Sequence, residues 1–431
     1  MNEYDSNRIL DLTKQINYTP VENFVDANCY ILNTCHIREK ATDKVYHEIG
    51  RLKKKLRNKE KPIVLIAGCV AQAEGDILLK KEKYIDAVIG PQSYHKINEL
   101  ILKIEKKNNI KNFTEFDVVE KFDSLNSLKN SDNKISSYLT IQEGCDKFCK
   151  FCVVPYTRGA EYSRSIKELV VETKNLVANG AREITLLGQN VNAYNFDGKR
   201  LSSLIFEISK IEDLKRIRYT TSHPKDFTDD LIDAHKNCEK LMPMIHLPIQ
   251  SGSNKILKAM NRKHTTEEYF EIINKLIKAK PEIKFSSDFI IGYPNESDDD
   301  FKKTIELLKK IKFINTFSFL FSGRPGTPAY YLNKLDQNVI KKRLIEFQAT
   351  AKKVKNSYKK GLFKKTLKVL FENKVKKENK YFGRDEHFNS VIVESNYDLI
   401  GKIENVQILK GNQNTLYGEI ISNLKQTNYA A

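Results

Sequence analysis

GCDKFCKFC occupies residues 144–152 and decides how the rest of this chain is interpreted. It spaces three cysteines, Cys145, Cys149 and Cys152, as C-x3-C-x2-C directly after a predicted strand. A loop of that spacing can hold three thiolates against one face of a 4Fe-4S cube, a cluster that otherwise takes four thiolates. One iron would then stay open for a small chelating ligand. The alternatives are three structural cysteines or a zinc site, and no nearby histidine supplies zinc with a fourth ligand.

The region around this loop predicts an open barrel. Strand-like apolar runs alternate with amphipathic helical patterns, such as those over 166–178, 267–278 and 298–310. The candidate strands are 138–142, 183–187, 216–221, 244–249, 284–291 and 316–321. Six β/α units are too few for a closed eight-fold barrel. We therefore expect a partial (β/α)6 barrel over residues 136–363, with its site at the carboxyl ends of the strands.

Two further regions flank this barrel. Residues 1–107 show strand patterns over 24–34 and 62–67 and helical patterns over 40–59 and 97–107. This alternation predicts an α/β domain with a doubly wound parallel sheet. The polar residues 108–135 are interpreted as a linker. Short strand patterns over 364–426 predict a small antiparallel β-barrel, a common nucleic-acid-binding shape.

The composition is strongly basic. The 431 residues include 73 Lys and Arg against 55 Asp and Glu, which gives a net charge of +18 and favours a polyanionic partner, with nucleic acid first. Ten of the basic residues lie within 341–365, where Glu346 is the only acid. That stretch is either a solvated helix face or part of an RNA footprint. Most aromatic residues of the last barrel should be core, with one or two free to stack on unpaired bases. They are Tyr381, Phe382, Phe388, Tyr397 and Tyr417.

Several classes of protein are excluded by the same composition. No run of about 18 apolar residues occurs, so we expect no membrane span. The first residues, MNEYDSNRIL, lack the basic and apolar segments of a signal peptide. Seven cysteines, an odd and unevenly spaced set, fit metal ligation in a reducing compartment better than disulfides. We expect a cytoplasmic monomer.

Residues 144–164, GCDKFCKFCVVPYTRGAEYSR, resemble the cluster loop of the radical S-adenosylmethionine (SAM) superfamily. Other segments resemble the methylthiotransferases within that superfamily, and the last barrel resembles a TRAM domain. These segments are NTCHIREKA (33–41), GCVAQ (68–72), TLLGQNVNAY (185–194), YTTSHP (219–224), LPIQSGSNKILKAMNRKHT (247–265), SSDFIIGYPNES (286–297) and RPGTPA (324–329). The resemblance implies that SAM binds the open iron through its amino and carboxylate groups. One electron then cleaves SAM to methionine and a 5′-deoxyadenosyl radical.

The resemblance also implies a second 4Fe-4S cluster, held by three cysteines of the N-terminal domain. Cys35 and Cys69 match two of them, and the third lies upstream of the MNEYDS segment in the family, beyond Met1 here. We expect that this start is internal to a longer chain that carries the missing cysteine and a first strand, which would be central if the sheet order resembles that of flavodoxin. The alternative is a protein that has lost its sulfur-donor cluster. Cys29 lies six residues before Cys35 on one predicted strand, about 20 Å away, so it is expected to be a small buried hydrophobe. Cys238 is interpreted in the same way.

Polar residues at the predicted strand ends are the candidates for cofactor contacts. The resemblance places SAM near Gln189 and Asn190, and near Ser222, Ser251 and Asp288; His223 lies at the same mouth. Each of these could instead be a turn, cap or satisfied core residue. Arg158, Arg164 and Arg324 could meet an RNA phosphate or the SAM carboxylate. His36 and Arg38 border Cys35 and should set the cluster environment rather than ligate.

The resemblance is strongest to members that methylthiolate C2 of N6-isopentenyladenosine beside the tRNA anticodon. A low-potential donor such as flavodoxin or ferredoxin is implied, and the anticodon loop suits the task because its bases can be splayed into a site. Two alternatives stay open. One is a methylthiotransferase for threonylcarbamoyladenosine or a ribosomal protein; the other is a non-catalytic RNA-binding protein with a structural cluster.

Overall fold

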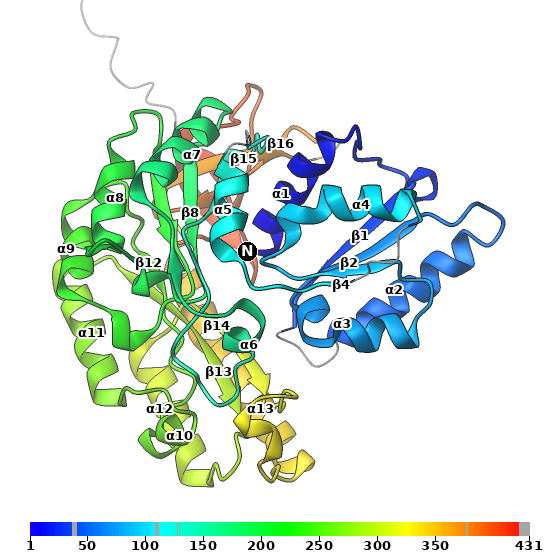
Figure 1. Cartoon of the computed structure of the whole chain (residues 1–431). Coiled ribbons are helices and arrows are strands. Elements are labelled where there is room, and N and C mark those ends of the chain that lie inside the picture. The colour runs from blue at the N-terminus through cyan, green and yellow to red at the C-terminus, as the bar shows by residue number, and fades with distance from the viewer. Residues whose placement is uncertain (37–40, 108–111, 127, 129, 376–377, 422–431) are drawn as a thin grey trace, which may run out of the picture.

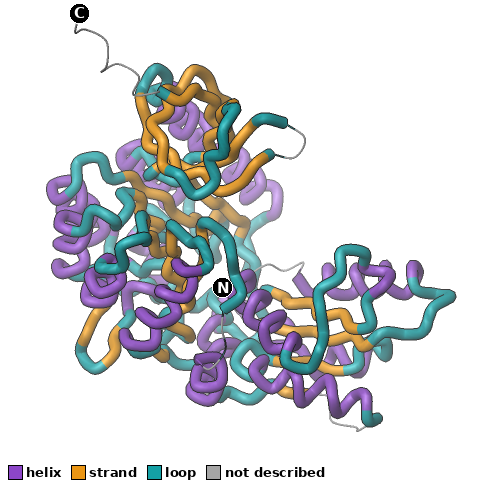
Figure 2. The backbone as a smooth tube through the Cα atoms, turned by 90° about the horizontal axis from the view of Figure 1, so that it is seen from above, coloured by secondary structure: helices purple, strands orange, loops and turns teal. Residues whose placement is uncertain are grey.

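The computed structural model describes residues 1–36, 41–107, 112–126, 128, 130–375 and 378–421. Figure 1 shows an N-terminal α/β domain beside a larger central domain whose helices wrap the outside of its strands. Seen from above in Figure 2, the small C-terminal barrel and the N-terminal sheet lie at separate edges of the central domain. The predicted α/β class and C-terminal barrel are confirmed.

The N-terminal domain is built on a four-stranded parallel sheet in the order β1-β2-β3-β4. The strands are β1 (Cys29–Thr34), β2 (Ile63–Gly68), β3 (Ala87–Ile89) and β4 (Asn112–Phe113). The helices are α1 (Asn2–Lys14), α2 (Ala41–Lys55), α3 (Cys69–Lys81), α4 (Ile97–Glu105) and α5 (Val118–Asn126). Helices α1, α4 and α5 cover one face through Leu65 and Ala67 of β2, whereas α2 and α3 cover the other through Ile66.

The described strands follow one another across the sheet, and β1 pairs directly with β2. The flavodoxin-like order concerns a strand upstream of Met1 and stays a prediction. One expectation about this domain is wrong. Residues 112–126 are not a linker, since β4 completes the sheet and α5 buries Phe122 and Leu125 in the domain core. The helix is short, and the Asn-, Ser- and Lys-rich residues on either side of it made the whole segment look like a linker. The first predicted strand is also shorter, because Phe24–Asp26 forms a 3-10 turn.

The central domain is the predicted open barrel. Its parallel strands are β5 (Ser136–Thr140), β8 (Glu183–Leu187), β11 (Arg216–Tyr219), β12 (Met244–His246), β13 (Lys284–Ile291) and β14 (Asn315–Leu320). They form two three-stranded sheets, β11-β8-β5 and β12-β13-β14, joined by a bridge between Ile217 and Leu241. The outer helices are α7 (Ile166–Ala178), α8 (Leu201–Ser209), α9 (Asp229–Asn237), α11 (Thr266–Ala279) and α12 (Asp298–Ile311).

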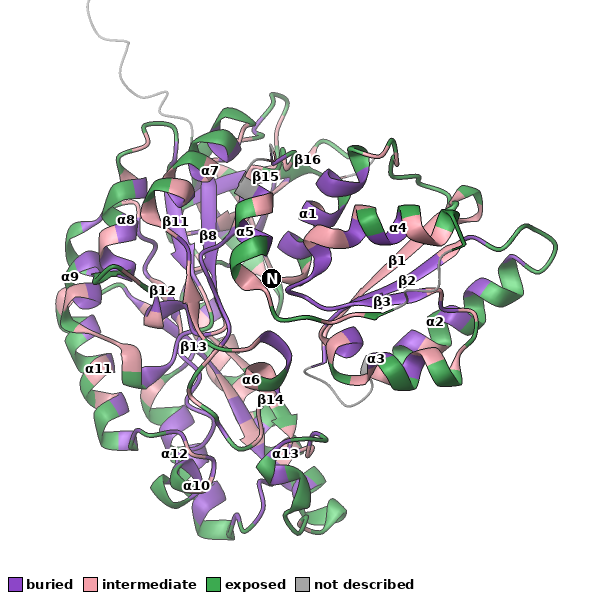
Figure 3. Ribbon diagram, viewed as in Figure 1, coloured by how far each residue is buried: buried purple, intermediate pink, exposed green. Residues whose placement is uncertain are grey.

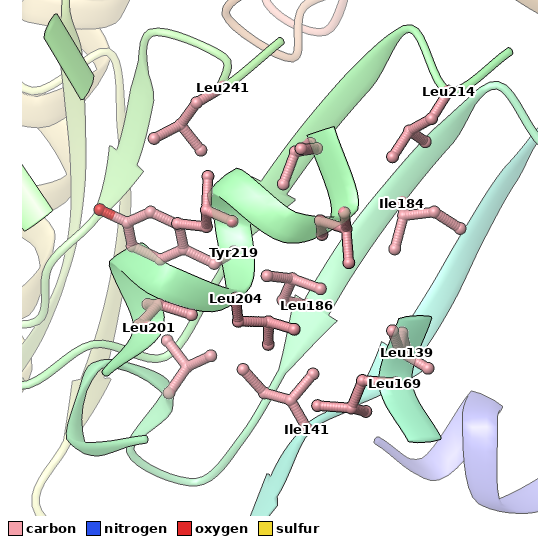
Figure 4. Close-up of a cluster of buried hydrophobic side chains, with 14 of the residues drawn as sticks. Leu139, Ile141, Leu169, Ile184, Leu186, Leu201, Leu204, Leu214, Tyr219 and Leu241 are labelled. Atoms are coloured by element: carbon pink, nitrogen blue, oxygen red, sulfur yellow. The ribbon is translucent and has the colours of Figure 1, made fainter. Parts of the chain in front are cut away.

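Alternation along the strands separates the two faces of this barrel. Ile184 and Leu186 of β8 point outward into the core beneath the helices, as Figure 4 shows. Their neighbours Glu183 and Thr185 therefore face the concave side. Figure 3 shows the same division, with buried strands and green outer faces on α9, α11 and α12. Capping boxes at Thr265 and Ser297 begin α11 and α12, which fixes where both helices leave the strand ends.

The last domain is a closed barrel in the order β15-β16-β17-β19-β18. Its strands are β15 (Thr366–Lys374), β16 (Lys380–Asp385), β17 (Ser390–Glu394), β18 (Ile403–Gly411) and β19 (Thr415–Ile420). The basic stretch 341–365 covers most of α13 (Gln337–Lys360) and the turn after it. The helix buries Ile340 and Phe347 and leaves most of its lysines exposed. Residues 422–426 of the predicted barrel lie outside the described residues.

Two arginines of β11 attach this barrel to the central domain. Arg218 donates to the carbonyl oxygens of Asp385 and Glu386, each at 2.8 Å. Arg216 donates to those of Arg384 at 2.8 Å and Lys368 at 2.9 Å. Of the barrel aromatics, Tyr381 is buried, whereas Phe388 lies under the guanidinium groups of Arg384 and Arg218. Tyr397 is half exposed.

Among the described residues, none of the helices combines the length and the apolar character that crossing a bilayer requires.

Candidate functional site

The loop with Cys145, Cys149 and Cys152 lies where β5 and its extension β6 (Gln142–Glu143) end, at the carboxyl edge of the barrel. Its entry is a left-handed glycine, Gly144, whose φ is 75°. The amide of Gly144 donates to Oε1 of Gln189 at 2.8 Å, and the amide of Cys145 donates to the carbonyl of Gly159 at 3.1 Å. The short helix α6 (Val154–Arg158) follows. The loop is therefore held at its base by the main chain and by β8.

The three thiols of the loop are unbridged and lie close enough to affect one another. Burial raises the pKa of Cys145 to about 12, and neighbouring thiols add to the effect. Burial and then Cys149 raise the pKa of Cys152 to about 12. The main-chain amides of Lys147 and Val154 donate to the sulfurs of Cys145 and Cys152. Amides directed at sulfur are what a bound thiolate-ligated cluster uses.

Arg262 lies at this loop but was not among the residues predicted to form the site. Arg262, in the turn between α10 (Asn254–Ala259) and α11, is buried and donates from Nη1 to Sγ of Cys149 at 3.5 Å. Its Nη2 donates to the carbonyl of Pro248 at 2.6 Å. A guanidinium against a sulfur stabilises the thiolate form. Arg262 lies in the segment 247–265 that resembles the family, and only this resemblance could have predicted its role. Its distance along the chain from the cysteines predicts no contact with them.

Buried polar atoms without partners gather at the ends of β8 and β11. Among the described residues these include Oδ1 of Asn190, Oγ of Ser222 and Nε2 of His223. Nδ2 of Asn190 is already engaged by Glu161 at 3.1 Å and Asp226 at 2.7 Å. Buried polar groups normally find partners, so the free atoms at one mouth fit the polar groups of a ligand such as SAM. This placement agrees with the predicted contacts of Asn190 and Ser222 with SAM. The contacts themselves stay predictions.

The remaining predicted SAM contacts have partners of their own. Gln189 uses its amide oxygen to hold Gly144. Ser251 is buried and accepts from the amide of Ser253 at 3.2 Å. Asp288 of β13 lies on the concave side, 3.5 Å from Nε2 of His246. The first two thus shape the loops of the mouth, and SAM contact by these three residues stays a prediction.

In the N-terminal domain, the two cysteines expected to bind a cluster end neighbouring strands. Cys35 follows β1 and Cys69 follows β2, and the preceding residues Thr34 and Gly68 are register partners. Gly68 has a φ of 90° and turns the chain sharply into α3. His36 lies 3.9 Å from Glu74, and burial lowers its pKa. Arg38 lies outside the described residues.

The interpretation of the other two cysteines is partly changed. Cys238 is buried in the core of the central domain, as expected. Cys29 is half-buried rather than buried, and it packs against the core of the N-terminal domain. In the part of the chain that the structure describes, no three His, Cys, Asp or Glu side chains converge so as to hold a single metal ion. The case for a cluster rests instead on the donor set and its amide and guanidinium partners.

The two cysteine sites face one another across the domain boundary. Helix α3, which begins at Cys69, packs against α6, which follows Cys152. Burial and Cys149 dominate the raised pKa of Cys152, and Cys69 adds to it. Across the same boundary, Arg324 of the central domain adds to the effect of burial in lowering the pKa of His36. The structure therefore brings together two groups of cysteines that are more than 70 residues apart in sequence.

For two arginines, burial argues against the possible contact with RNA. Arg158 is buried and pairs with Asp5 and Glu143. Arg164 is buried as well and pairs with Glu172 at 2.8 Å. Both guanidinium groups are buried and already paired with carboxylates, so neither is open to an RNA phosphate. Their positions after the cluster loop suggested a ligand, but the sequence could not show that acidic residues from other elements would meet them.

Comparisons with known proteins agree with this architecture. Residues 139–308 match the radical SAM superfamily, and residues 1–90 match uncharacterized protein family UPF0004. A tRNA-2-methylthio-N(6)-dimethylallyladenosine synthase of Pelagibacter ubique is 58% identical over 99% of this chain and 96% of its own length. The enzyme of the same name from Wolbachia pipientis subsp. Culex pipiens is 48% identical over 97% of each chain.

A solved structure shares the fold. The radical SAM methyltransferase TsrM of Kitasatospora setae has a TM-score of 0.57 at 12% identity, over 76% of this chain and 74% of its own. The cysteine loop on an open barrel, preceded by the N-terminal sheet, defines a radical SAM enzyme of the methylthiotransferase class. The chain belongs to the family of tRNA-2-methylthio-N(6)-dimethylallyladenosine synthases, as its identity to their full length shows.

Proposed function

We propose that this chain modifies tRNA by methylthiolating C2 of N6-isopentenyladenosine next to the anticodon, which gives 2-methylthio-N6-isopentenyladenosine. The observation that carries the proposal is the 58% identity to a synthase of that name over 99% of the chain, with every cysteine of the barrel loop in place. Iron–sulfur clusters and SAM are implied by the two matched families.

The residues of the barrel loop have defined roles in this proposal. Cys145, Cys149 and Cys152 would hold a 4Fe-4S cluster with one open iron. When bound, that cluster and SAM supply a 5′-deoxyadenosyl radical able to remove the hydrogen from an adenine C2. Arg262 stabilises the Cys149 sulfur, while the amides of Lys147 and Val154 do the same for its neighbours. Asn190 and Ser222 offer their free oxygens to SAM.

The N-terminal cysteines would take part in sulfur insertion. Cys35 and Cys69 end adjacent strands and can contribute two ligands to a second cluster. Their position facing the barrel loop supports this role, because sulfur has to reach the same adenine that loses a hydrogen. We assign the electron supply to a low-potential donor such as flavodoxin or ferredoxin, and we expect the chain to act as a monomer.

The RNA would enter from the open side of the barrel. Phe317 of β14 is 46% exposed and contacts His246 edge-on at 5.9 Å between ring centroids. Aromatic and imidazole rings of this kind stack on unpaired bases, which supports an anticodon-loop substrate. The exposed lysines of α13 and the attached barrel would bind phosphates.

Nucleoside analysis of an anaerobic reaction tests this proposal. Reconstituted protein is incubated with SAM, a reductant and tRNA carrying N6-isopentenyladenosine, and the tRNA is digested for mass spectrometry. We expect both 5′-deoxyadenosine and the 2-methylthio nucleoside. The Cys145→Ala variant should produce neither, and Cys238→Ala, which removes a core thiol outside the site, is the matched control.

The alternatives give different products. If tRNA containing threonylcarbamoyladenosine, or ribosomal protein, is methylthiolated while isopentenyladenosine stays unchanged, the substrate assignment is wrong. If reduced protein of full iron content releases no 5′-deoxyadenosine, the chain is an RNA-binding protein with a structural cluster.

A further inference from the structure

A buried network of four charged residues connects the N-terminal domain to the base of the barrel loop. Arg158 at the end of α6 donates from Nη2 to Asp5 of α1 at 2.7 Å and from Nη1 to Glu143 at 3.2 Å. The same Oε1 of Glu143 also pairs with Nζ of Lys121 on α5. All four side chains are at most 3% exposed. Two acids and two bases thus pair with one another inside a buried interface.

The network closes the cysteine loop at its two ends. Glu143 lies two residues before Cys145, and Arg158 lies six residues after Cys152, so their ion pair joins the chain as it enters and leaves the loop. Each of the two outer members, Asp5 and Lys121, comes from a helix of the N-terminal domain. The guanidinium of Arg158 bridges the domains because its two amino groups diverge toward different carboxylates, a geometry that lysine cannot reproduce.

Neighbouring contacts connect Arg158 to the N-terminal cysteine site as well. The side chain of Gln92, which follows β3, donates to the main-chain carbonyl of Arg158. Helix α3, with Cys69 at its first turn, packs on α6. Burial alone would lower the pKa of Arg158, but Asp5, Cys69 and Glu143 together raise it well above its usual value. The guanidinium of Arg158 therefore interacts electrostatically with groups of both domains and stays charged.

Buried ion pairs seldom stabilise a fold more than apolar residues would, and their best-attested use is to set register. Here a displacement of α1 or α5 along the central domain would leave a buried charge without its partner, whereas an apolar interface would tolerate the same displacement. We propose that Asp5, Arg158, Glu143 and Lys121 are positioning residues that set the separation of the two cysteine sites. Sulfur insertion, which needs both sites, depends on this network, while SAM cleavage at the barrel loop does not. This inference rests on the proposed function.

The test removes the two outer members together. The double variant Asp5→Asn/Lys121→Met keeps the net charge and leaves the Glu143–Arg158 pair at the loop base. The control, Glu3→Gln/Lys134→Met, removes a half-exposed ion pair that also joins α1 to the chain leading into β5. Three quantities are measured on reconstituted protein: 5′-deoxyadenosine formed, methylthiolated product per 5′-deoxyadenosine, and the magnetic interaction between the two reduced clusters by electron paramagnetic resonance.

We expect 5′-deoxyadenosine formation within about twofold of the parent protein, a fall of at least tenfold in product per 5′-deoxyadenosine, and a weakened or heterogeneous cluster–cluster interaction. The control should match the parent in all three. Arg158→Lys keeps the positive charge but loses the two diverging amino groups of the guanidinium, and it should give the same changes at smaller size.

The inference is overturned if the double variant keeps the parent's ratio of methylthiolated product to 5′-deoxyadenosine and the parent's spectrum. It is equally overturned if iron binding or 5′-deoxyadenosine formation falls in parallel with product, since the network would then only support folding. If the parent protein forms no methylthiolated product, the proposed function fails, and the spectra still test the separation of the sites.

Discussion

The guanidinium of Arg262, a buried residue in the turn between α10 and α11, lies 3.5 Å from the sulfur of Cys149. A buried positive charge that donates to a ligand sulfur favours the reduced and more negative state of a cluster bound there. The same arginine is held by the carbonyl of Pro248, so its position is set by the protein and not by the cluster.

We therefore predict that Arg262→Gln lowers the reduction potential of the cluster at the barrel loop by about 60 mV, a tenfold change in a one-electron equilibrium. Redox titration followed by electron paramagnetic resonance measures this shift. Lys263→Gln, which removes an exposed charge at the next position, is the control. An unchanged potential in Arg262→Gln would show that the contact with Cys149 has no electrostatic effect on the cluster.

The entry glycine of the cluster loop provides a second prediction. At Gly144, with a φ of 75°, an added Cβ would lie 1.8 Å from the carbonyl oxygen of Ala160, a main-chain atom that cannot turn aside. Gly144→Ala should displace the loop and reduce iron bound at this site by at least half. Gly198 has a φ of 78° and open space around it, so Gly198→Ala bears only the left-handed backbone cost of about 1–2 kcal/mol. Iron and sulfide analysis of both variants distinguishes collision from backbone strain.

The attachment of the C-terminal barrel can be tested through Arg218. Its two bonds to the carbonyls of Asp385 and Glu386 are charge-assisted, and each is worth about 1.5–3 kcal/mol. We expect Arg218→Met to loosen the barrel and weaken tRNA binding about tenfold, with SAM cleavage in the absence of tRNA unchanged. Binding is measured by filter retention at fixed salt. Arg182→Met is the control, because Arg182 donates to Val177 and Ala181 within its own domain; equal losses in both variants would contradict the docking role.

Stability should depend on pH through His235. This histidine of α9 is fully buried, with Nε2 2.6 Å from the hydroxyl of Tyr219, and burial lowers its pKa to about 3. An unfolded histidine binds a proton near pH 6.5, so the unfolded chain binds more protons between these values. The contribution of His235 to the free energy of unfolding should therefore be greatest above pH 6.5. It should decrease toward pH 3 by up to about 1.4 kcal/mol per pH unit.

His235→Phe should remove the contribution of this one proton from the slope, and it should lower stability at neutral pH because the Tyr219 hydroxyl loses its hydrogen-bond partner. Denaturant titrations at several pH values between 4 and 7 measure the slope. The control is His47→Gln, which replaces an exposed histidine of the N-terminal domain. If the slope of His235→Phe equals that of the parent, the buried imidazole is not the group that titrates.

Much of the architecture was predictable because periodicity and loop chemistry are local. The bounds of β8, β13 and α7 agree with the predicted residues, since their apolar pattern, turns and caps lie within each segment. The segment 112–126 was missed because α5 owes its burial to Phe122 and Leu125, which meet the N-terminal core only after the chain has folded back. The order of the N-terminal sheet was equally out of reach, because strand adjacency is not encoded in the pattern of any one strand.

For the site, the sequence alone determined the three-cysteine loop and the excess of basic charge. These follow from residue type and spacing, which are properties of the linear chain. The tertiary structure alone decided that Arg262 contacts Cys149, that Cys69 faces Cys152, and that Arg158 is enclosed by Asp5 and Glu143 instead of lying open to RNA. The physical reason is that pairing between charges depends on distance through space, and residues 5 and 158 become neighbours only when two domains pack together.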